Sequence, residues 1–331
     1  MVVAAVLVLL GLAIFLRSKA PPEAARLLPE SDGIFYLNFK PVRAFFRKDL
    51  KPPQRVPDYQ QFVDATGIDW ERDLDEAAIA LHRMPNPNGP NGPVAYSMVL
   101  VGKLTGTRLK AWLTAHAASQ ESYAGRTIYS IPSEGRTVRV AQIGYDMVAV
   151  SNTPTPEQIH SIIDRRRTAA LPFAGSTLLS HHFHEVPLLA LAWGVGQIGL
   201  PFSESGAIQI FGFRLPLEDG ATLIASVTPM LRLRGELRLR VEEIAPTEPA
   251  AASQAEALGM LVNMARGFTA PLGPDPANDA LKHLLATTEV SRKSDRVVVT
   301  ATLHSAQLAQ IAAGENSPAE QVTPADQDAS K

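Results

Sequence analysis

The densest group of side chains able to bind a metal is the run His181-His182-Phe183-His184-Glu185. If this run is helical, His181 lies on one face with His184 (i, i+3) or with Glu185 (i, i+4). Imidazole nitrogens and carboxylate oxygens are zinc ligands, so these three residues are the candidate metal ligands. No HExxH motif accompanies them, and further ligands would have to come from elsewhere. The alternative is a solvated helix end that leads into Val186-Pro187.

A row of arginines forms a second candidate site, in the segment from Met230 to Val241, where apolar and charged residues alternate. Period 2 held this long predicts a half-buried antiparallel strand. Its arginines would project from one face and could meet lipid phosphates or an acidic partner. They are Arg232, Arg234, Arg238 and Arg240. The alternative is a solvated face on which they pair with Glu236 and Glu242.

Two other patterns resemble binding motifs but lack the context that the chemistry needs. Gly194 to Gly199 matches GxGxxG, yet Pro201 and the short segment before Ala207 leave no room for the helix that holds a pyrophosphate. A glycine-rich strand end is the better interpretation. The acidic run from Asp69 to Glu76 lacks the glycine and glutamate positions of a calcium loop, so a solvated turn is expected there. No cofactor is predicted.

Short apolar segments bounded by glycine and proline predict strands in pairs and triplets, with helices between them. Expected strands are 34–39, 77–84, 94–103, 127–131, 136–143, 146–151, 188–195, 207–213, 221–229, 230–241, 288–292 and 297–303. Expected helices are 23–28, 42–46, a segment ending at Gly67, 107–118, 154–167, 176–184, 249–267, 278–286 and 305–313. This order predicts an α+β fold with two mostly antiparallel sheet domains and packed helices behind an N-terminal transmembrane helix.

The predicted organisation has five parts. They are a transmembrane signal anchor at 1–17, a linker at 18–31, an α+β domain at 32–169, a second α+β domain at 170–314 and a disordered tail at 315–331. Both domains contain an apolar strand, a hairpin and a helix, which suggests an old duplication, although residue identity does not demonstrate it.

The chain begins with an apolar segment, Met1 to Leu16, that holds no charged side chain and ends at Arg17. A membrane helix needs about 17–25 apolar residues, and an arginine that snorkels to the interface extends this segment. A small-x-small cleavage pattern exists at Ser18-Lys19-Ala20, but Pro21 follows it directly and disfavours cleavage. An uncleaved anchor is therefore expected, with the lipid bilayer as partner of residues 1–17.

Composition excludes several function classes. The 331 residues carry 31 basic and 33 acidic side chains, a net charge of −2, so nucleic acid is not an expected partner. The absence of cysteine excludes disulfides, thiolate metal sites and cysteine nucleophiles. No P-loop, nucleophile elbow or kinase signature is present.

Three segments resemble uncharacterised bacterial envelope proteins of a domain-of-unknown-function family common in acidobacteria. The segments are LLPESDGIFYLNFKPVRAF (27–45), TGIDWERDLDEAAIAL (66–81) and TEVSRKSDRVVVTATL (288–303). The resemblance covers most of the chain after residue 26, and its motifs are structural. It implies a membrane-tethered, extracytoplasmic α+β body, and it transfers no active-site residue.

The two lines of reasoning disagree about orientation. The basic residues Arg17, Lys19 and Arg26 follow the apolar segment, and the positive-inside rule then places the body in the cytoplasm. The family resemblance implies a single-pass inner membrane protein with a periplasmic body, which we take as the leading expectation. The cytoplasmic body stays open as the alternative.

These observations predict a membrane-anchored, non-enzymatic binding or scaffold module of the bacterial envelope, with a protein or lipid partner. One alternative is a metal-dependent hydrolase that uses the region from His181 to Glu185. Another is an apolar-ligand carrier, which would need a sizeable apolar cavity.

Overall fold

The computed structural model describes residues 20–46, 57–89, 92–104, 106–168, 175–197, 207–210, 213–216, 220–230, 235–269, 271, 273 and 276–304. The expected anchor, the expected tail, Arg232 and Arg234 lie outside these ranges. Within the ranges, no helix combines the length and apolar character that a membrane crossing needs.

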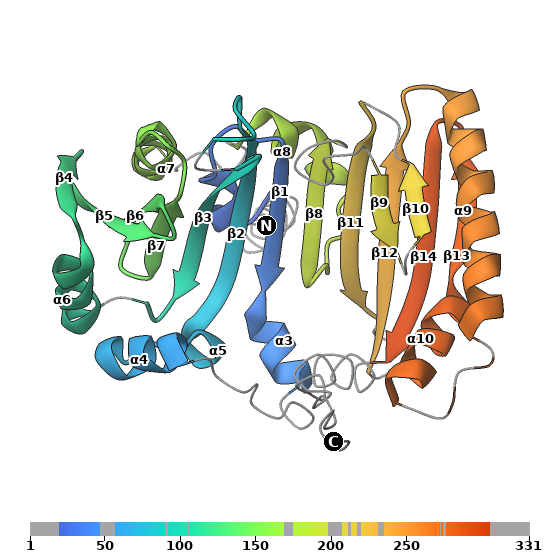
Figure 1. Cartoon of the computed structure of the whole chain (residues 1–331), viewed down its shortest axis with the longest axis horizontal. Helices are drawn as coiled ribbons and strands as arrows, with labels where there is room; N and C mark the ends of the chain where they lie inside the picture. Colours follow the sequence, from blue (N-terminus) through green and yellow to red (C-terminus); the bar gives the residue numbers. More distant parts are fainter. Residues whose placement is uncertain are drawn as a thin grey trace, which may run out of the picture.

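A 12-stranded sheet runs through the whole body (Figure 1), in the order β13-β14-β12-β11-β8-β1-β2-β3-β7-β6-β5-β4. A hairpin, β9 (Ala207–Ile210) with β10 (Phe213–Pro216), lies apart from it. The large sheet consists of β1 (Gly33–Asn38), β2 (Leu74–Arg83), β3 (Val94–Gly102), β4 (Ser119–Tyr123), β5 (Arg126–Ser133), β6 (Arg136–Gln142), β7 (Met147–Ser151), β8 (Ala192–Gln197), β11 (Thr222–Pro229), β12 (Glu236–Ile244), β13 (Glu289–Lys293) and β14 (Arg296–His304).

The α+β class with a mostly antiparallel sheet is confirmed, but the two predicted sheets are one. β1 pairs antiparallel with β2 on one side and with β8 on the other. Ile34 lies opposite Val195 in this second pairing, so both neighbours of β1 continue the same apolar face. A strand with apolar side chains and free backbone groups on each edge pairs on both edges. Hydrogen bonds therefore join the two predicted domains; whether they unfold separately stays a prediction.

The helices cover both faces of the sheet. They are α2 (Glu23–Arg26), α3 (Phe39–Phe46), α4 (Pro57–Thr66), α5 (Trp70–Asp73), α6 (Thr107–His116), α7 (Glu157–Arg167), α8 (Thr177–His182), the short 3₁₀ helix η1 (Phe183–Glu185), α9 (Glu248–Thr269) and α10 (Pro276–Thr287). We call the face under α2, α7 and α8 the α2 face, and the opposite face, under α4, α6 and α9, the α9 face. Successive residues of a strand point to opposite faces, so the strand registers assign each side chain to one of them.

The main core lies on the α2 face. The short helix predicted at 23–28 is confirmed as α2, and Ala24, Ala25 and Leu28 are fully buried against the sheet. Ile159 and Ile163 of α7 pack into this same core. The α9 face holds two separate clusters, one under α4 and α6 and one under α9.

The two halves of the sheet repeat one topology from the centre outward. The first half runs β1-β2-β3-β7-β6-β5-β4, and the second runs β8-β11-β12-β14-β13, so the first half carries β5 and β4 in addition to the five positions that the halves share. In each half, a central strand precedes a hairpin, and a helical segment then leads to a second hairpin whose last strand pairs with the first hairpin. This arrangement supports the duplication that the sequence suggested.

The strand predicted at 230–241 begins later than expected. β12 starts at Glu236, after Gly235 in a left-handed conformation with φ of +88°. The Met230 N–H donates to the Glu236 carbonyl, which closes the connection from β11. Glycine adopts this φ without steric cost, so the chain turns within a sequence that alternates like a strand.

Candidate functional site

A polar pocket of about 460 Å³ opens at the strand ends in the central part of the sheet, where β1 begins and β2 ends, and we call it the edge pocket. Three segments form it: the approach to β1, the end of β2, and the connection from β7 into α7. The pairing of Gly33 with Leu81 places the first two side by side. The lining residues are Glu30, Ser31, Asp32, His82, Arg83, Met84, Thr153, Pro154, Thr155, Glu157 and Gln158.

Behind the pocket, side-chain hydrogen bonds cross three strands. His82 Nε2 lies 3.0 Å from Ser97 Oγ, which lies 3.2 Å from Ser151 Oγ. Ser151 Oγ lies 2.9 Å from Thr153 Oγ1, and Thr153 donates to the Thr155 carbonyl at 2.9 Å. Ser97 and Ser151 are 0% exposed, so these hydroxyls are closed to solvent.

The surroundings of the His82 ring favour its neutral form. Burial lowers its pKa from the usual 6.5, while the charge of Asp32 and a hydrogen bond to the Glu30 backbone oppose this shift. A carbonyl can only accept, so the ring nitrogen facing Glu30 carries the proton. The other nitrogen, Nε2, then accepts from the Ser97 hydroxyl. The His82 imidazole thus determines the donor in the first hydrogen bond of this series, which is the Ser97 hydroxyl.

The carboxylates of the pocket are oriented by the main chain and by arginines. Asp32 accepts the Arg83 N–H at 2.6 Å. Glu30 accepts from Arg165 at 3.1 Å and from the Thr177 N–H at 2.9 Å. These bonds leave acceptor capacity on both carboxylates, because each oxygen can accept more than one hydrogen bond.

The opposite wall is fixed from behind by Arg139 of β6. Its guanidinium donates to the Thr153 carbonyl at 2.7 Å and to the Pro154 carbonyl at 3.0 Å. The Ser31 hydroxyl oxygen is buried and has no hydrogen-bonding partner among the residues that the structure describes. A buried hydroxyl without a partner is costly, and Ser31 lines this pocket, so a ligand or a water that reached the hydroxyl would relieve that cost.

The lining combines hydroxyls, carboxylates, one guanidinium, one amide and the His82 imidazole with the apolar groups of Met84 and Pro154, and it includes no Phe, Tyr or Trp. Sites for flat or apolar ligands are built from aromatic and aliphatic side chains, so this lining fits a small polar ligand instead. The hydroxyls bonded to His82 lie under the wall, where a substrate cannot reach them. The pocket therefore offers hydrogen-bonding groups to a small polar ligand.

The predicted metal ligands lie elsewhere, at the end of α8 and in η1. Glu185 Oε1 is 2.8 Å from Arg296 Nη2 of β14 and 3.1 Å from His184 Nε2. The hydrogen bond from Arg296 holds the pKa of Glu185 below its usual value. Among the described residues, no group of three or more His, Cys, Asp or Glu side chains is placed to hold a metal ion. The region from His181 to Glu185 makes an ion-pair cluster with the sheet.

The two described arginines of the predicted row differ from each other. Arg240 pairs with the buried Glu242, which Arg296 also contacts at 2.7 Å. Arg238 is exposed on the same face. This partly matches the alternative in which the arginines pair with neighbouring carboxylates.

Two glycines of the GxGxxG pattern, Gly194 and Gly196, lie within β8. Gly194 pairs with Phe35 of β1, and a Cβ there would come within 2.7 Å of the Phe35 ring. Gly199 lies outside the described residues. The pattern thus reflects close packing of an aromatic ring on a strand, in agreement with the strand-end interpretation.

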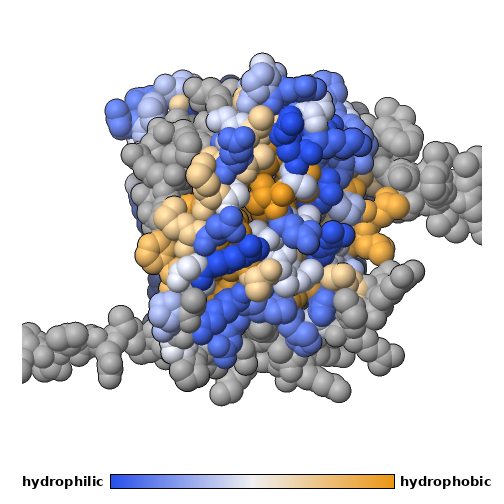
Figure 2. All heavy atoms as spheres, turned by 90° about the vertical axis from the view of Figure 1, so that its right-hand side faces the viewer, coloured by the Kyte–Doolittle hydropathy of each residue, from blue (hydrophilic) through white to orange (hydrophobic). Residues whose placement is uncertain are grey.

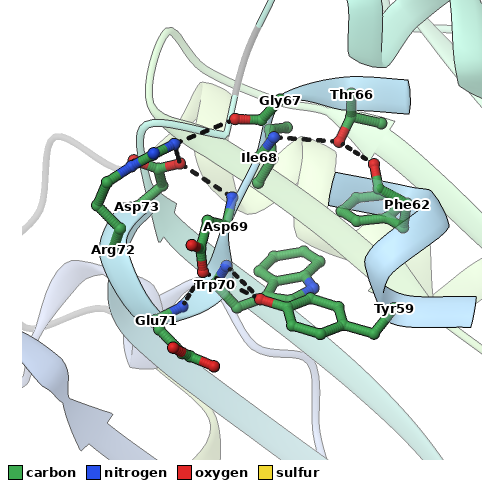
Figure 3. A network of polar contacts seen from close by, with 10 residues as sticks. All are labelled: Tyr59, Phe62, Thr66, Gly67, Ile68, Asp69, Trp70, Glu71, Arg72 and Asp73. Carbon is green, nitrogen blue, oxygen red and sulfur yellow. Dashed lines mark hydrogen bonds and ion pairs between the residues drawn. The ribbon is translucent and has the colours of Figure 1, made fainter. Parts of the chain in front are cut away.

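The acidic run from Asp69 builds the turn between α4 and β2 (Figure 3). Asp69 accepts from the Glu71 N–H at 3.1 Å and so caps α5, while Asp73 accepts from the Asp69 N–H at 3.0 Å. Arg72 closes the turn with bonds to Asp73 at 2.6 Å and to the Gly67 carbonyl at 3.2 Å. Tyr59 of α4 donates to Asp69 at 3.1 Å.

The edge pocket was not predicted, although one signal for it exists in the sequence. Ala78, Ala80 and His82 alternate along β2 and are all buried on the α2 face. A histidine at a position that the period assigns to the core is either paired or functional. Its partners come from strands more than ten residues away, so the sequence alone does not reveal them.

Comparisons with known proteins do not assign this chain to a family. No family model matches it, and no curated protein matches it. Among solved structures, crystal form III of TP0453 aligns at 9% identity and a TM-score of 0.46, covering 89% of this chain and 99% of that chain. Crystal form IV of TP0453 aligns at 10% identity and a TM-score of 0.47, covering 88% and 96%. These similarities are weak and carry no functional conclusion.

Proposed function

We propose that this chain is a membrane-anchored, non-enzymatic binding module of the bacterial envelope, and that the edge pocket is its binding site. The observation that carries this proposal is a polar pocket of about 460 Å³ whose lining includes the carboxylates of Glu30 and Asp32, beside a buried Ser31 hydroxyl that has no partner among the described residues. The volume lies in the range of small-ligand sites. The apolar segment from Met1 to Leu16 supports the anchor, and the resemblance to envelope proteins supports a body outside the cytoplasm.

Ligand binding is tested with three probes of different charge: spermidine, glutamate and N-acetylglucosamine. We expect one of them to raise the melting temperature of the full chain, because a ligand that binds only the folded state stabilises it. Ser31→Val fills the position of the unpaired hydroxyl and should abolish this rise without unfolding the protein. Ser133→Val, at the exposed end of β5, is the matched control and should leave the rise intact. An equal rise in both variants, or no rise with any probe, would contradict the proposed site.

The anchor and its orientation need a separate measurement. With a tag on the C-terminal segment, protease added to spheroplasts should digest the body from outside. Leu10→Arg should release the protein from membranes, because an arginine at a helix centre costs about 2.5–3.5 kcal/mol on insertion, whereas Leu10→Ile should not. Protection of the tag until lysis would place the body in the cytoplasm and overturn the envelope location.

A further inference from the structure

The chain enters the body through the core of the α2 face. Ala24 and Ala25 are 0% exposed, and Leu27 and Leu28 follow them into the same cluster. α2 packs on β1, β2 and β3, in the central part of the sheet. The N-terminal part of the described chain therefore does not leave from an edge of the sheet. It leaves from the middle of one face.

Two ion pairs fix α2 and the segment after it to α7. Glu23 Oε1 is 2.7 Å from Arg166 Nη1, and Glu30 Oε1 is 3.1 Å from Arg165 Nη2. With apolar burial between them, these contacts make residues 23–30 part of the folded body. The segment available as a flexible link to the predicted anchor is therefore shorter than the predicted linker at 18–31.

The remaining link is residues 17–22, six residues between the last apolar residue of the predicted anchor and the first residue of α2. Six residues span at most about 20 Å when fully extended. We infer that the α2 face is turned toward the membrane and lies against the lipid headgroups. This inference rests on the proposed anchor at Met1 to Leu16.

Side chains on this face suit a headgroup surface. Leu188 and Leu189 are 58% and 56% exposed, and they lie between Val186 and Ala190, which both pack on the core of the α2 face. Arg167 at the end of α7 lies 3.7 Å from Asp164 and keeps a side chain that is 66% exposed. Exposed leucines and a basic side chain together fit the boundary between acyl chains and phosphates.

The competing surface is the outer side of α9, seen in Figure 2, where Met260 and Met264 are 66% and 44% exposed. α9 packs near β13 and β14, and β14 is five strands away from β2. Five steps of about 4.8 Å are about 24 Å, before the thickness of the helix is added. A link of about 20 Å does not bring this side to the bilayer while α2 stays in the core.

A labelling experiment tests this orientation in the full chain. The protein has no cysteine, so Ser161→Cys on α7 and Ser253→Cys on α9 each create one labelling site. Both variants carry the same dye and are reconstituted into phosphatidylethanolamine–phosphatidylglycerol vesicles with an acceptor dye on the headgroups. We expect higher energy-transfer efficiency from position 161 than from position 253. Inserting about 20 Gly/Ser residues between Lys19 and Ala20 should remove this difference, because such a link is a flexible coil.

The outcomes separate this inference from the proposed function. If the full chain does not float with the vesicles, the anchor itself fails and the inference falls with it. If the chain floats and transfer from position 253 equals or exceeds transfer from position 161, the anchor stands and the orientation is overturned. If the difference persists after the insertion, a short link is not its cause.

Discussion

At the scale of single residues, His82 makes the stability of the folded chain depend on pH. Its pKa is below the usual 6.5 because the ring is buried, so the folded state resists the proton that the unfolded state accepts. The contribution of His82 to the free energy of unfolding is fully present above pH 6.5 and decreases as the pH falls below that value. The slope for one proton approaches about 1.4 kcal/mol per pH unit.

We therefore expect urea unfolding at pH 7.5 and at pH 5.5 to show a larger loss of stability in the natural chain than in His82→Gln. Glutamine keeps a polar side chain for Ser97 but does not titrate. His116, which is exposed on α6, supplies the control His116→Gln, whose pH dependence should match that of the natural chain. Identical pH dependence in all three proteins would show that His82 is not the group responsible.

A second residue-scale prediction concerns Arg296, which contacts the carboxylates of Glu185 and Glu242. Glu242 is 2% exposed, so removing the guanidinium leaves a buried charge with Arg240 as its remaining ion-pair partner among the described residues. We expect Arg296→Met to lower the free energy of unfolding by about 2 kcal/mol. The control Arg238→Met, at an exposed position of β12, should change it by less than about 0.5 kcal/mol. Chemical denaturation at neutral pH measures both.

At the scale of elements, two glycines make opposite predictions. Gly194→Ala brings a methyl group into the Phe35 ring across the β1–β8 pair, and overpacking of this kind costs about 1–3 kcal/mol. Gly259 lies within α9, where a Cβ would meet nothing within 4 Å. Gly259→Ala should therefore stabilise the protein by about 0.5–1 kcal/mol, because alanine has the higher helix propensity. Thermal unfolding distinguishes the two, and a stabilising Gly194→Ala would refute the close contact.

The boundaries of strands were predicted more accurately where a regular apolar alternation or a turn residue defines them. Strands β5, β6 and β7 match their expected ranges within a few residues because turns at 132–135 and 144 separate them. β4, with the polar sequence SQESY, was missed because it has no apolar alternation, and pairing with β5 creates it. β12 was placed too early because alternation continues through the turn at Gly235.

The site was harder to predict than the fold for a physical reason. The clusters found in the sequence were contiguous, whereas the edge pocket joins residues near 31, 82 and 154. Contiguous charges on a surface often pair with their sequence neighbours, as Arg240 does with Glu242. Buried polar contacts such as His82 to Ser97 depend on which strands become adjacent, and that information lies in the pairing of β2 with β3.

At the scale of the whole molecule, the core of the α2 face takes residues from both predicted domains. Ile34 and Ile159 come from the first, and Trp193 and Ile224 come from the second. Because one cluster contains all four, we expect a single cooperative unfolding transition.

The natural chain has three tryptophans, of which Trp70 and Trp112 report on the first half and Trp193 on the second. The double variant Trp70→Phe, Trp112→Phe keeps only the tryptophan of the second half, and Trp193→Phe keeps only those of the first. In each variant, we expect the urea midpoint from tryptophan fluorescence to equal the midpoint from circular dichroism of the same variant. Two midpoints within one chain would restore the prediction of two independent domains.

The pairing of β1 with β8 has a consequence for how such a molecule could arise. In a symmetric dimer, each subunit offers the same strand edge to the other, and the two-fold axis passes between the paired strands. The repeated orders β1-β2-β3-β7 and β8-β11-β12-β14 meet at such an antiparallel pair. A half-length ancestor with β1 at its edge would have closed that edge by self-association. Fusion of two copies into one gene would then free each half to change independently.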